Sequence, residues 1–456
     1  MKFHSEPIRE HAEAPIADDG LLDEIIQNWD RRMATPADSI ARTNRCYVVT
    51  LGAEADQSAQ LAEILSLVRT QGDEIVGHET VKLLKPNPRT LVGSGKAKEI
   101  AARALQHGAN LLVIDAELSP SQMRNLEDAA GISVSDREAI ILNVFLKNAK
   151  TRRAKIQVEL AHLEYLRPRI RGIGLDMDQQ ASSIVTGRGP GETASALLAR
   201  KIDRRIAEHR KALLKIKRSD TVQREGRASC RKVTFVGYTN AGKTSLMNAI
   251  AGVSLSVMDR PFETLDTTTR LLTHHGGDVL IGDTVGFIRR LPDRLLASFE
   301  STLEGIKESA LLLFVVDIAD PEKTMHLSTT LNVLAKLGAD HVPRLYVFNK
   351  VDILDHPPIP EDLKELTQGQ PWVVLSSRDQ DAVKELRAKI LSLVRSDQPV
   401  KKVFVPYAAT NVFPLIYSQF RVMDSVARDG GVLFSVEGEP HVFALIKKML
   451  SEVCHE

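Results

Sequence analysis

Residues Gly237 to Thr244 could bind phosphate groups, because they read Gly-Tyr-Thr-Asn-Ala-Gly-Lys-Thr and complete the pattern GxxxxGK[ST]. They follow the apolar run KVTFV and precede a helical segment, which is the context that this pattern requires. The glycines allow backbone N–H groups to close around phosphates, and the start of the helix adds the positive end of its dipole. The predicted phosphate-binding residues are Gly237, Tyr238, Thr239, Asn240, Ala241, Gly242, Lys243 and Thr244. Within this loop, Lys243 is expected to reach the β and γ phosphates, and Thr244 to offer its hydroxyl to Mg²⁺.

A second motif, Asp283-Thr284-Val285-Gly286, ends the apolar run DVLIG. In this position Asp283 is expected to hold Mg²⁺ from its second coordination sphere, and the Gly286 amide to sense the γ phosphate. The next residue is Phe287, where many proteins with these motifs carry the glutamine that orients the attacking water. Because an apolar side chain cannot orient water, either hydrolysis is slow until a partner completes the site or another group of the chain substitutes.

The identity of the base is predicted by a third motif, Asn349-Lys350-Val351-Asp352, which follows the apolar run RLYVF. The carboxylate of Asp352 can accept from the two donors on the edge of guanine, whereas adenine offers a mismatched pattern. After the run WVVL come Ser376, Ser377 and Arg378, where a backbone amide can meet the guanine carbonyl. These residues predict that the nucleotide is GTP.

The segment PFETLDTTTR lies between the phosphate loop and Asp283, and it contains the candidate threonine of a mobile switch. Such a threonine offers its hydroxyl to Mg²⁺ and its amide to the γ phosphate. Thr264 is the preferred residue, although Thr267, Thr268 and Thr269 satisfy the same spacing. The predicted catalytic residues are therefore Lys243, Thr264 and Gly286, with Thr244 and Thr264 as the predicted metal ligands.

These motifs must be positioned by α/β domains, because apolar strand-like runs alternate with helical segments along most of the chain. Residues 1–44 are polar and predict a disordered tail, and residues 45–136 predict a small α/β domain. Residues 228–396 predict a domain with a largely parallel sheet, in which RLLTHHGGDVLIGD forms a hairpin with one antiparallel strand. Residues 397–456 predict a small α+β domain with a strand, a helix from Pro414 to Ala427, a second strand and a closing helix.

Between the two α/β domains, residues 137–222 predict a basic helical hairpin. Residues 139–167 contain no Gly or Pro and predict one continuous helix, and residues 193–218 predict a second helix whose apolar seam includes His209 as a packed residue. The intervening stretch from Pro168 to Glu192 is long and rich in Gly and Arg. A connection of this length is uncommon unless it has a function, so we expect it at the tip of the hairpin.

Charge is distributed unevenly along the chain. The whole sequence has 60 Lys and Arg against 59 Asp and Glu, but the section from Lys147 to Lys232 has 22 against 9. Such a section favours a polyanion, and we expect Arg169, Arg171 and Arg188 to contact structured RNA. The alternative is a solvated helical face without a partner.

Other features of the chain are less informative. Three scattered cysteines are too few for a disulfide framework or a zinc site, and the sequence contains neither a signal peptide nor a membrane-spanning segment. We therefore expect a cytoplasmic protein without an integral membrane segment. We also expect it to be monomeric. The run Gly93-Ser94-Gly95-Lys96 lacks the full phosphate-loop pattern, and it predicts only a glycine turn that opens a helix.

The motifs GYTNAGKT, FETLD, DTVGFI and NKVD resemble those of the HflX family of ribosome-associated GTPases. The segments NPRTLVGSGKAKE, DAELSPSQMRNLED, KIQVELAHLEYLRPR and TGRGPGE extend this resemblance over nearly the whole chain from about Cys46. The resemblance implies a Ras-like P-loop GTPase domain that binds GTP and Mg²⁺. It also implies GTP contacts at Phe262, Glu263, Thr264, Leu265 and Asp266.

The family resemblance further implies binding to the large ribosomal subunit and its rRNA, and separation or rescue of stalled ribosomes under stress. Two other hypotheses remain open at the sequence level. In the first, the protein binds RNA or assists ribosome assembly, and GTP only sets its affinity. In the second, residues 46–136 form an RNA-remodelling ATPase, although no phosphate-binding loop supports that activity there.

Overall fold

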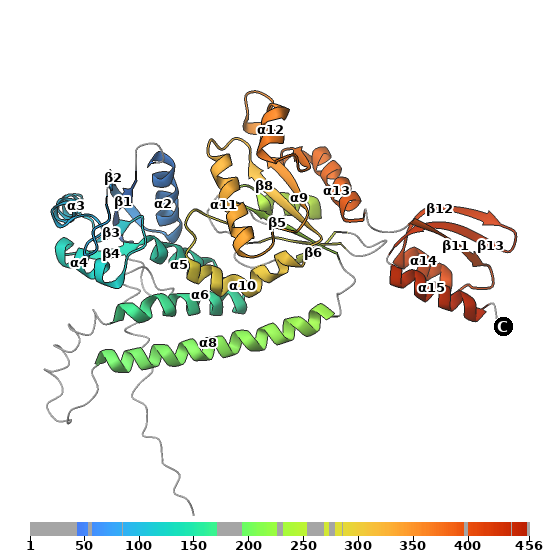
Figure 1. Ribbon diagram of the computed structural model, residues 1–456, viewed down its shortest axis with the longest axis horizontal. Coiled ribbons are helices and arrows are strands. Elements are labelled where there is room, and N and C mark those ends of the chain that lie inside the picture. Colours follow the sequence, from blue (N-terminus) through green and yellow to red (C-terminus); the bar gives the residue numbers. More distant parts are fainter. Residues whose placement is uncertain are drawn as a thin grey trace, which may run out of the picture. The chain divides into compact units, whose positions relative to one another are not determined.

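Figure 1 shows the computed structural model of the chain. The structure describes residues 43–52, 57–83, 85–170, 194–225, 231–252, 269–272, 279–284, 286–395, 400–438 and 440–453. It divides into two compact units: the first contains the described residues up to Asn143 and Tyr165–Ala207, and the second contains Val144–Glu164 and those from Glu208 onward. No described helix is long and apolar enough to cross a lipid bilayer.

The first unit contains a four-stranded parallel sheet in the order β2-β1-β3-β4. Its strands are β1 (Arg45–Leu51), β2 (Glu74–Val81), β3 (Leu111–Ile114) and β4 (Ser133–Asp136). The connecting helices are α2 (Gln57–Gln71), α3 (Ser94–Gln106) and α4 (Pro120–Ala130), with α3 and α4 side by side (Figure 1). Gly93 is the N-cap of α3, so the prediction that Gly93 to Lys96 open a helix is confirmed.

The single helix predicted over residues 139–167 is wrong in one respect, because two helices occupy this stretch. They are α5 (Arg137–Asn148) and α6 (Arg152–Leu166), followed by the 3₁₀ turn η2 (Arg167–Arg169). The Thr151 hydroxyl accepts a hydrogen bond from the Ala154 N–H at 3.1 Å and caps the start of α6. A helix can therefore end and restart without Gly or Pro when a capping side chain satisfies the new N-terminus.

The second predicted hairpin helix is α8 (Ala194–Glu225), which runs antiparallel to α6. In the first unit, Arg167 donates to both carboxylate oxygens of Asp203, at 2.6 and 2.7 Å. In the second unit, Arg210 pairs with Glu164 at 2.7 Å, and His209 Nε2 lies 3.1 Å from Glu159. The loop that joins the two helices, residues 171–193, lies outside the described residues.

A six-stranded sheet in the order β10-β9-β8-β5-β7-β6 carries the three nucleotide motifs. Its strands are β5 (Arg231–Gly237), β6 (Thr269–Leu271), β7 (Val279–Gly282), β8 (Leu311–Asp317), β9 (Arg344–Asn349) and β10 (Trp372–Val374). Its helices are α9 (Lys243–Ala251), α10 (Asp293–Lys307), α11 (Lys323–Lys336), α12 (Pro360–Leu366) and α13 (Gln380–Arg395). Only β6 is antiparallel among these strands, so the predicted β6–β7 hairpin is confirmed.

The core of this sheet forms because its central strands are apolar on both faces. Residues 311–316 of β8 are all buried, and alternate residues such as Leu313 and Val315 pack with α9 and α13. Parallel strands covered by helices on both sides have this continuous apolar character. The sheet therefore gives a rigid edge on which the loops after β5, β7 and β9 are held.

The last described part is a three-stranded antiparallel sheet with two helices. It contains β11 (Val400–Pro406), α14 (Val412–Gln419), β12 (Arg421–Arg428), β13 (Gly431–Glu437) and α15 (Pro440–Val453), with strand order β11-β13-β12. The helix predicted from Pro414 to Ala427 is wrong in its second half, because residues 421–428 are a strand. Asp429 and Gly430 form the two-residue turn between β12 and β13, with Gly430 at a φ of 86°. An Asp-Gly pair between strand-like segments is the signal that would have predicted this hairpin.

Candidate nucleotide site

The phosphate loop between β5 and α9 needs glycine at both ends of its motif. Gly237 has a φ of +149°, and a Cβ atom there would lie 2.3 Å from the Val315 carbonyl oxygen. Gly242 has a φ of +90°, and a Cβ atom there would lie 2.3 Å from Asn349 Nδ2. Side chains at these positions would clash and strain the backbone, so the two glycines are required for this loop to close.

Lys243 is the first residue of α9, and its ammonium group is buried inside the loop. Its Nζ atom donates to the carbonyl oxygens of Gly237 at 3.1 Å and Tyr238 at 2.7 Å. Burial lowers the pKa of Lys243 to about 8, and the nearby Asp283 carboxylate opposes this shift. Burying the positive charge of Lys243 in this loop costs free energy. An incoming phosphate, which is negatively charged, would therefore stabilise the protonated ammonium group strongly.

Thr244 and Asp283 bring the first two motifs together. The Thr244 hydroxyl donates to Asp283 Oδ2 at 2.7 Å, and the Thr284 N–H donates to Asp283 Oδ1 at 3.0 Å. Asp283 is fully buried. The loops after β5 and β7 therefore place a hydroxyl and a carboxylate side by side beside the phosphate loop.

Gly286 also lies against the phosphate loop. A Cβ atom at this position would be 2.8 Å from Thr239 Cγ2 and 3.0 Å from Lys243 Nζ. Phe287 is buried, its N–H donates to the Gly237 carbonyl at 3.2 Å, and its carbonyl accepts from the Thr239 N–H at 2.8 Å. A buried ring held in this way cannot orient a water molecule.

The third motif joins the phosphate loop to the loop after β10. Asn349 Nδ2 donates to the Ala241 carbonyl at 3.0 Å, and Asn349 Oδ1 accepts from the Ser377 N–H at 3.0 Å. Lys350 has a φ of 66° and pairs with Asp317 at 2.7 Å. Asn349, at the end of β9, therefore links the phosphate loop to the loop after β10 through its side chain, and these contacts hold the edge where a base would lie.

Asp352 is partly exposed at this edge, with about a third of its side chain (33%) open to solvent. A hydrogen bond from the Ser376 side chain is the largest cause that holds the pKa of Asp352 below its ordinary value, and the guanidinium of Arg378, 3.1 Å away, acts in the same direction. The carboxylate is therefore ionised and can accept two hydrogen bonds.

Six of the predicted site residues lie outside the part of the chain that the structure describes: Phe262, Glu263, Thr264, Leu265, Asp266 and Val285. Of the competing switch threonines, Thr269 is described, and it belongs to β6, where it is opposite Gly282 of β7. The remaining site residues come from the ends of β5, β7, β9 and β10 and meet at one edge of the sheet.

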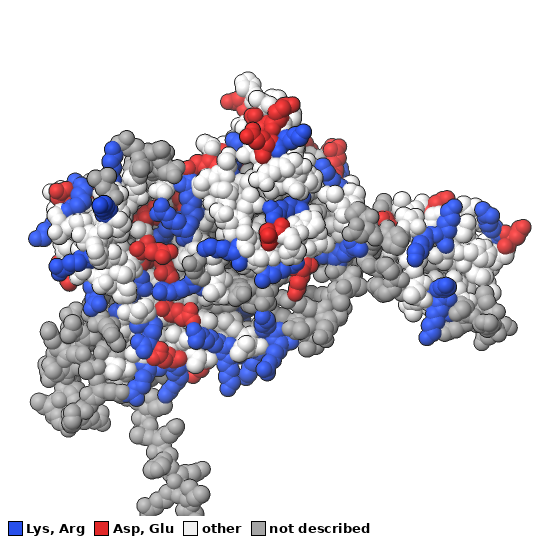
Figure 2. Space-filling view, viewed as in Figure 1, with Lys and Arg blue, Asp and Glu red and all other residues white. Residues whose placement is uncertain are grey.

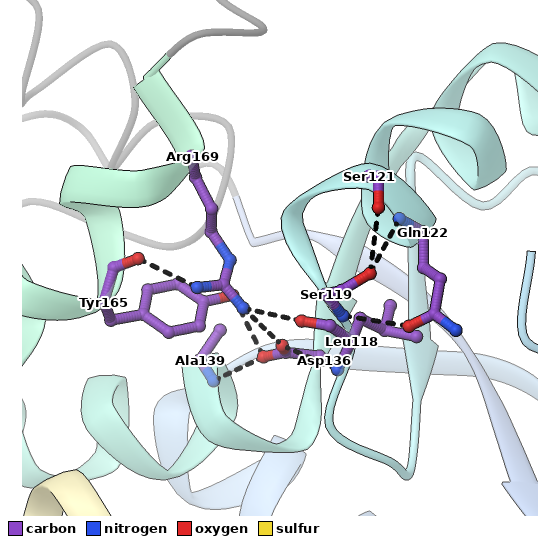
Figure 3. A network of polar contacts seen from close by, with 8 residues as sticks. All are labelled: Leu118, Ser119, Ser121, Gln122, Asp136, Ala139, Tyr165 and Arg169. Atoms are coloured by element: carbon purple, nitrogen blue, oxygen red, sulfur yellow. Dashed lines mark hydrogen bonds and ion pairs between the residues drawn. The ribbon is translucent and has the colours of Figure 1, made fainter. Parts of the chain in front are cut away.

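Figure 3 shows the contacts of Arg169, which contradict its predicted role in RNA binding. Its side chain is buried, pairs with Asp136 at 3.1 Å, and donates to the carbonyl oxygens of Leu118 at 2.8 Å and Tyr165 at 2.9 Å. Its guanidinium also lies 3.6 Å from the centre of the Tyr165 ring. The prediction for Arg169 is therefore wrong, because this side chain holds η2 against the N-terminal sheet. Arg171 and Arg188 lie outside the described residues.

Comparison with known proteins agrees with the motifs. Three family models match successive parts of the chain: the GTP-binding GTPase N-terminal model over residues 58–146, the GTP-binding GTPase middle region over 148–227, and the 50S ribosome-binding GTPase over 232–350. Relatives named GTPase HflX include one from Spirochaeta thermophila, 37% identical over 80% of this chain and 88% of its own length. Another from Gluconacetobacter diazotrophicus is 36% identical over 86% of this chain and 94% of its own length.

The chain belongs to the HflX family of GTPases. Its P-loop GTPase fold, its ligand GTP and its activity as a GTP-hydrolysing enzyme are those predicted from the motifs. A crystal structure of a GTP-binding protein from Sulfolobus solfataricus in complex with GDP aligns with 77% of this HflX chain and 99% of its own, at 23% identity and a TM-score of 0.41. The family assignment rests on the sequence relatives.

The sequence did not reveal all the residues that shape this HflX site. Tyr238 of the phosphate loop stacks on His326 of α11, with ring centres 3.6 Å apart and an interplanar angle of 14°. Asp317, the partner of Lys350, ends β8 and belongs to no recognised motif. Both contacts join residues from different strands or helices, so no local pattern could have predicted them.

Proposed function

We propose that this HflX GTPase associates with the large ribosomal subunit and separates or rescues stalled ribosomes. The family whose model matches residues 232–350 is that of 50S ribosome-binding GTPases, and this match supports the choice of partner. The observation within this chain that carries the proposal is the basic surface of α8. A polyanion of large area, such as ribosomal RNA, is the partner that this charge favours.

The basic side chains of α8 are spread along its exposed side, and many Lys and Arg side chains are visible around this helix in Figure 2. The exposed ones are Arg200, Arg204, Arg210, Lys211, Lys215, Lys217 and Arg218. In the second unit, a groove is lined by Arg152 of α6 and by Lys211 and Lys215 of α8. These residues replace Arg169 as the described candidates for phosphate contacts.

The phosphate loop suits Mg²⁺ as the companion of GTP. The Thr244 hydroxyl and the Asp283 carboxylate lie 2.7 Å apart and offer the hard oxygen atoms that Mg²⁺ prefers. Bound Mg²⁺ would neutralise charge on the β and γ phosphates. Thr264 is proposed as a further ligand, and Lys243 would contact the same phosphates.

At position 287 the chain offers no side chain that could orient the attacking water, because Phe287 is apolar and buried. We therefore expect slow hydrolysis by the free protein and acceleration by large subunits that complete the site. Single-turnover GTP hydrolysis should be measured with and without purified large subunits. An equal rate in both conditions would rule out activation by this partner while leaving the GTP site intact.

Binding itself is tested by co-sedimentation with large subunits in the presence of GTP analogue, GDP or no nucleotide, over a salt series. The double variant Lys211→Glu/Lys215→Glu should bind more weakly and with a salt slope reduced by about one for each lost phosphate contact. Lys364→Glu, in the exposed part of α12, is the matched control. Unchanged binding of the double variant would show that the charge of α8 is only a solvated face.

A second candidate function is RNA binding or ribosome assembly with GTP as a switch of affinity. The same basic surface would serve it, so the distinction lies in the outcome of binding. Whole ribosomes incubated with protein and GTP should separate into subunits, as measured by gradient sedimentation. Association with free subunits without separation of whole ribosomes would favour the assembly role.

The third hypothesis, an ATPase in the N-terminal sheet, receives no support from the described residues. In a parallel sheet of order β2-β1-β3-β4, ligands bind at the carboxyl ends of β1 and β3. Arg137 lies at this edge, buried between Asp115, 2.6 Å away, and Glu63. Two carboxylates already neutralise this arginine, so it is not poised to receive a phosphate.

A further inference from the structure

Tyr238 contacts three different parts of the GTPase site at once. Its carbonyl oxygen accepts from Lys243 Nζ at 2.7 Å, and its hydroxyl accepts from the Arg289 backbone N–H at 2.9 Å. Its ring stacks on His326 of α11. The residue is 8% exposed, so these contacts are held within the protein.

The segment after Gly286 depends on these contacts for its position. Three backbone N–H groups hold it to the phosphate loop: Phe287 donates to Gly237, Thr239 donates to the Phe287 carbonyl, and Arg289 donates to the Tyr238 hydroxyl. The last of these is the only one of the three that ends on a side chain. The placement of Gly286, which lies against Thr239 and Lys243, is therefore sensitive to Tyr238.

The start of α11 contacts both Tyr238 and Arg289. His326 stacks on the Tyr238 ring, and Glu322, the N-cap residue of α11 four positions earlier, pairs with the Arg289 side chain. Residues four apart on a helix share one face, so these two supports act together. The Asp320 carboxylate lies 3.1 Å from His326 Nδ1 and orients the imidazole.

Close packing alone does not fix the Tyr238 ring. A cavity of about 50 Å³ lies between the phosphate loop and α11, and its lining includes Tyr238, Asn240, His326 and Thr330. Beside such a cavity, a side chain freed from its partners has room to move. The stacked imidazole and the hydroxyl contact both help to fix where the ring lies.

We propose that Tyr238 is a positioning residue for GTP hydrolysis, held in place by the first turn of α11. It acts through the backbone of residues 286–289 and touches neither the reacting water nor the guanine edge. Loss of its hydroxyl contact therefore slows hydrolysis without weakening nucleotide binding. This role concerns the chemical step of the GTPase itself and does not depend on the ribosomal proposal.

The test is the variant Tyr238→Phe, which keeps the stacked ring and removes the acceptor of the Arg289 N–H. Single-turnover GTP hydrolysis should be about five- to tenfold slower, the loss expected for one hydrogen bond felt mainly in the transition state. The affinity for GDP should stay within about twofold of the original protein. Tyr346→Phe, at a second buried tyrosine of the same sheet, is the control and should hydrolyse GTP at the original rate.

The role of α11 is tested with His326→Ala and His326→Phe. The alanine variant removes the stack and should slow hydrolysis to a similar extent, whereas the phenylalanine variant restores a ring and should recover most of the rate. The proposal is overturned if Tyr238→Phe hydrolyses GTP at the original rate. A parallel loss of GDP affinity and hydrolysis would equally overturn it, because Tyr238 would then serve only to build the binding site.

Discussion

The N-terminal sheet and the GTPase sheet both bury a basic side chain at the carboxyl edge of parallel strands, but the two charges have different surroundings. Arg137 is enclosed by the carboxylates of Asp115 and Glu63, and these raise its pKa. Lys243 is surrounded by carbonyl oxygens, and burial lowers its pKa to about 8. Similar architecture therefore gives a neutralised structural cation in one sheet and a cation suited to an incoming phosphate in the other.

The largest expected effect comes from Lys243→Ala. Without the ammonium group, the phosphate loop loses its charge at the β and γ phosphates, so hydrolysis should fall by about 10³-fold or more. Single-turnover hydrolysis at saturating GTP measures this. If the variant kept substantial activity, Lys243 would not be the cation that binds the phosphates, and its difference from Arg137 would have no role in function.

The choice of base should respond strongly to Asp352→Asn. An amide cannot accept from both donors of guanine, so GTP affinity should fall by about 10²-fold and xanthosine nucleotides should become preferred. Competition binding with both nucleotides measures the change. A variant that prefers GTP by the original margin would contradict the role of Asp352.

Arg137→Ala should show the opposite pattern from Lys243→Ala. It leaves Asp115 and Glu63 without their shared cation in a buried place, which should cost about 3 to 5 kcal/mol of stability. Thermal and urea unfolding measure the loss. GTP hydrolysis at low temperature, where the variant remains folded, should be unchanged. A loss of GTP hydrolysis under those conditions would show that this ion pair belongs to the catalytic machinery.

The smallest effect concerns pH. Because the pKa of Lys243 is about 8 in the folded protein, below its ordinary value of 10.5, the unfolded chain binds more protons between these values, and this group makes stability rise with pH in that window. Phosphate binding favours the charged form, so GDP binding should take up a proton above pH 8. GDP affinity should then fall by up to about tenfold per pH unit. Calorimetry in buffers of different ionisation enthalpy measures this proton uptake, and its absence would contradict the shifted pKa.

The local motifs could be predicted from sequence because each depends on neighbouring residues. A strand, a glycine-rich turn and a helix start follow one another in residues 231–251, and the two glycines that the turn requires are part of the pattern. The antiparallel β6–β7 pair was also predictable, because the stretch RLLTHHGGDVLIGD places two apolar runs on either side of Gly276 and Gly277. The Asp429-Gly430 turn carried a similar signal, although the helix predicted from Pro414 to Ala427 obscured it.

By itself, then, the sequence determined the order of the elements in the GTPase domain, the phosphate loop and the choice of GTP, since these follow from backbone conformation and residue type over short stretches. Only the tertiary structure decided which charges are buried and which partners they meet. Arg169 was expected on an RNA-binding loop, and packing placed it against Asp136. Tyr238 was expected only as part of the phosphate loop, and packing placed it on His326. Burial and pairing of a side chain depend on segments that are distant in the chain. Because burial removes a charged group from water and raises its free energy, the partners that it meets in the fold determine whether the charge is stable there.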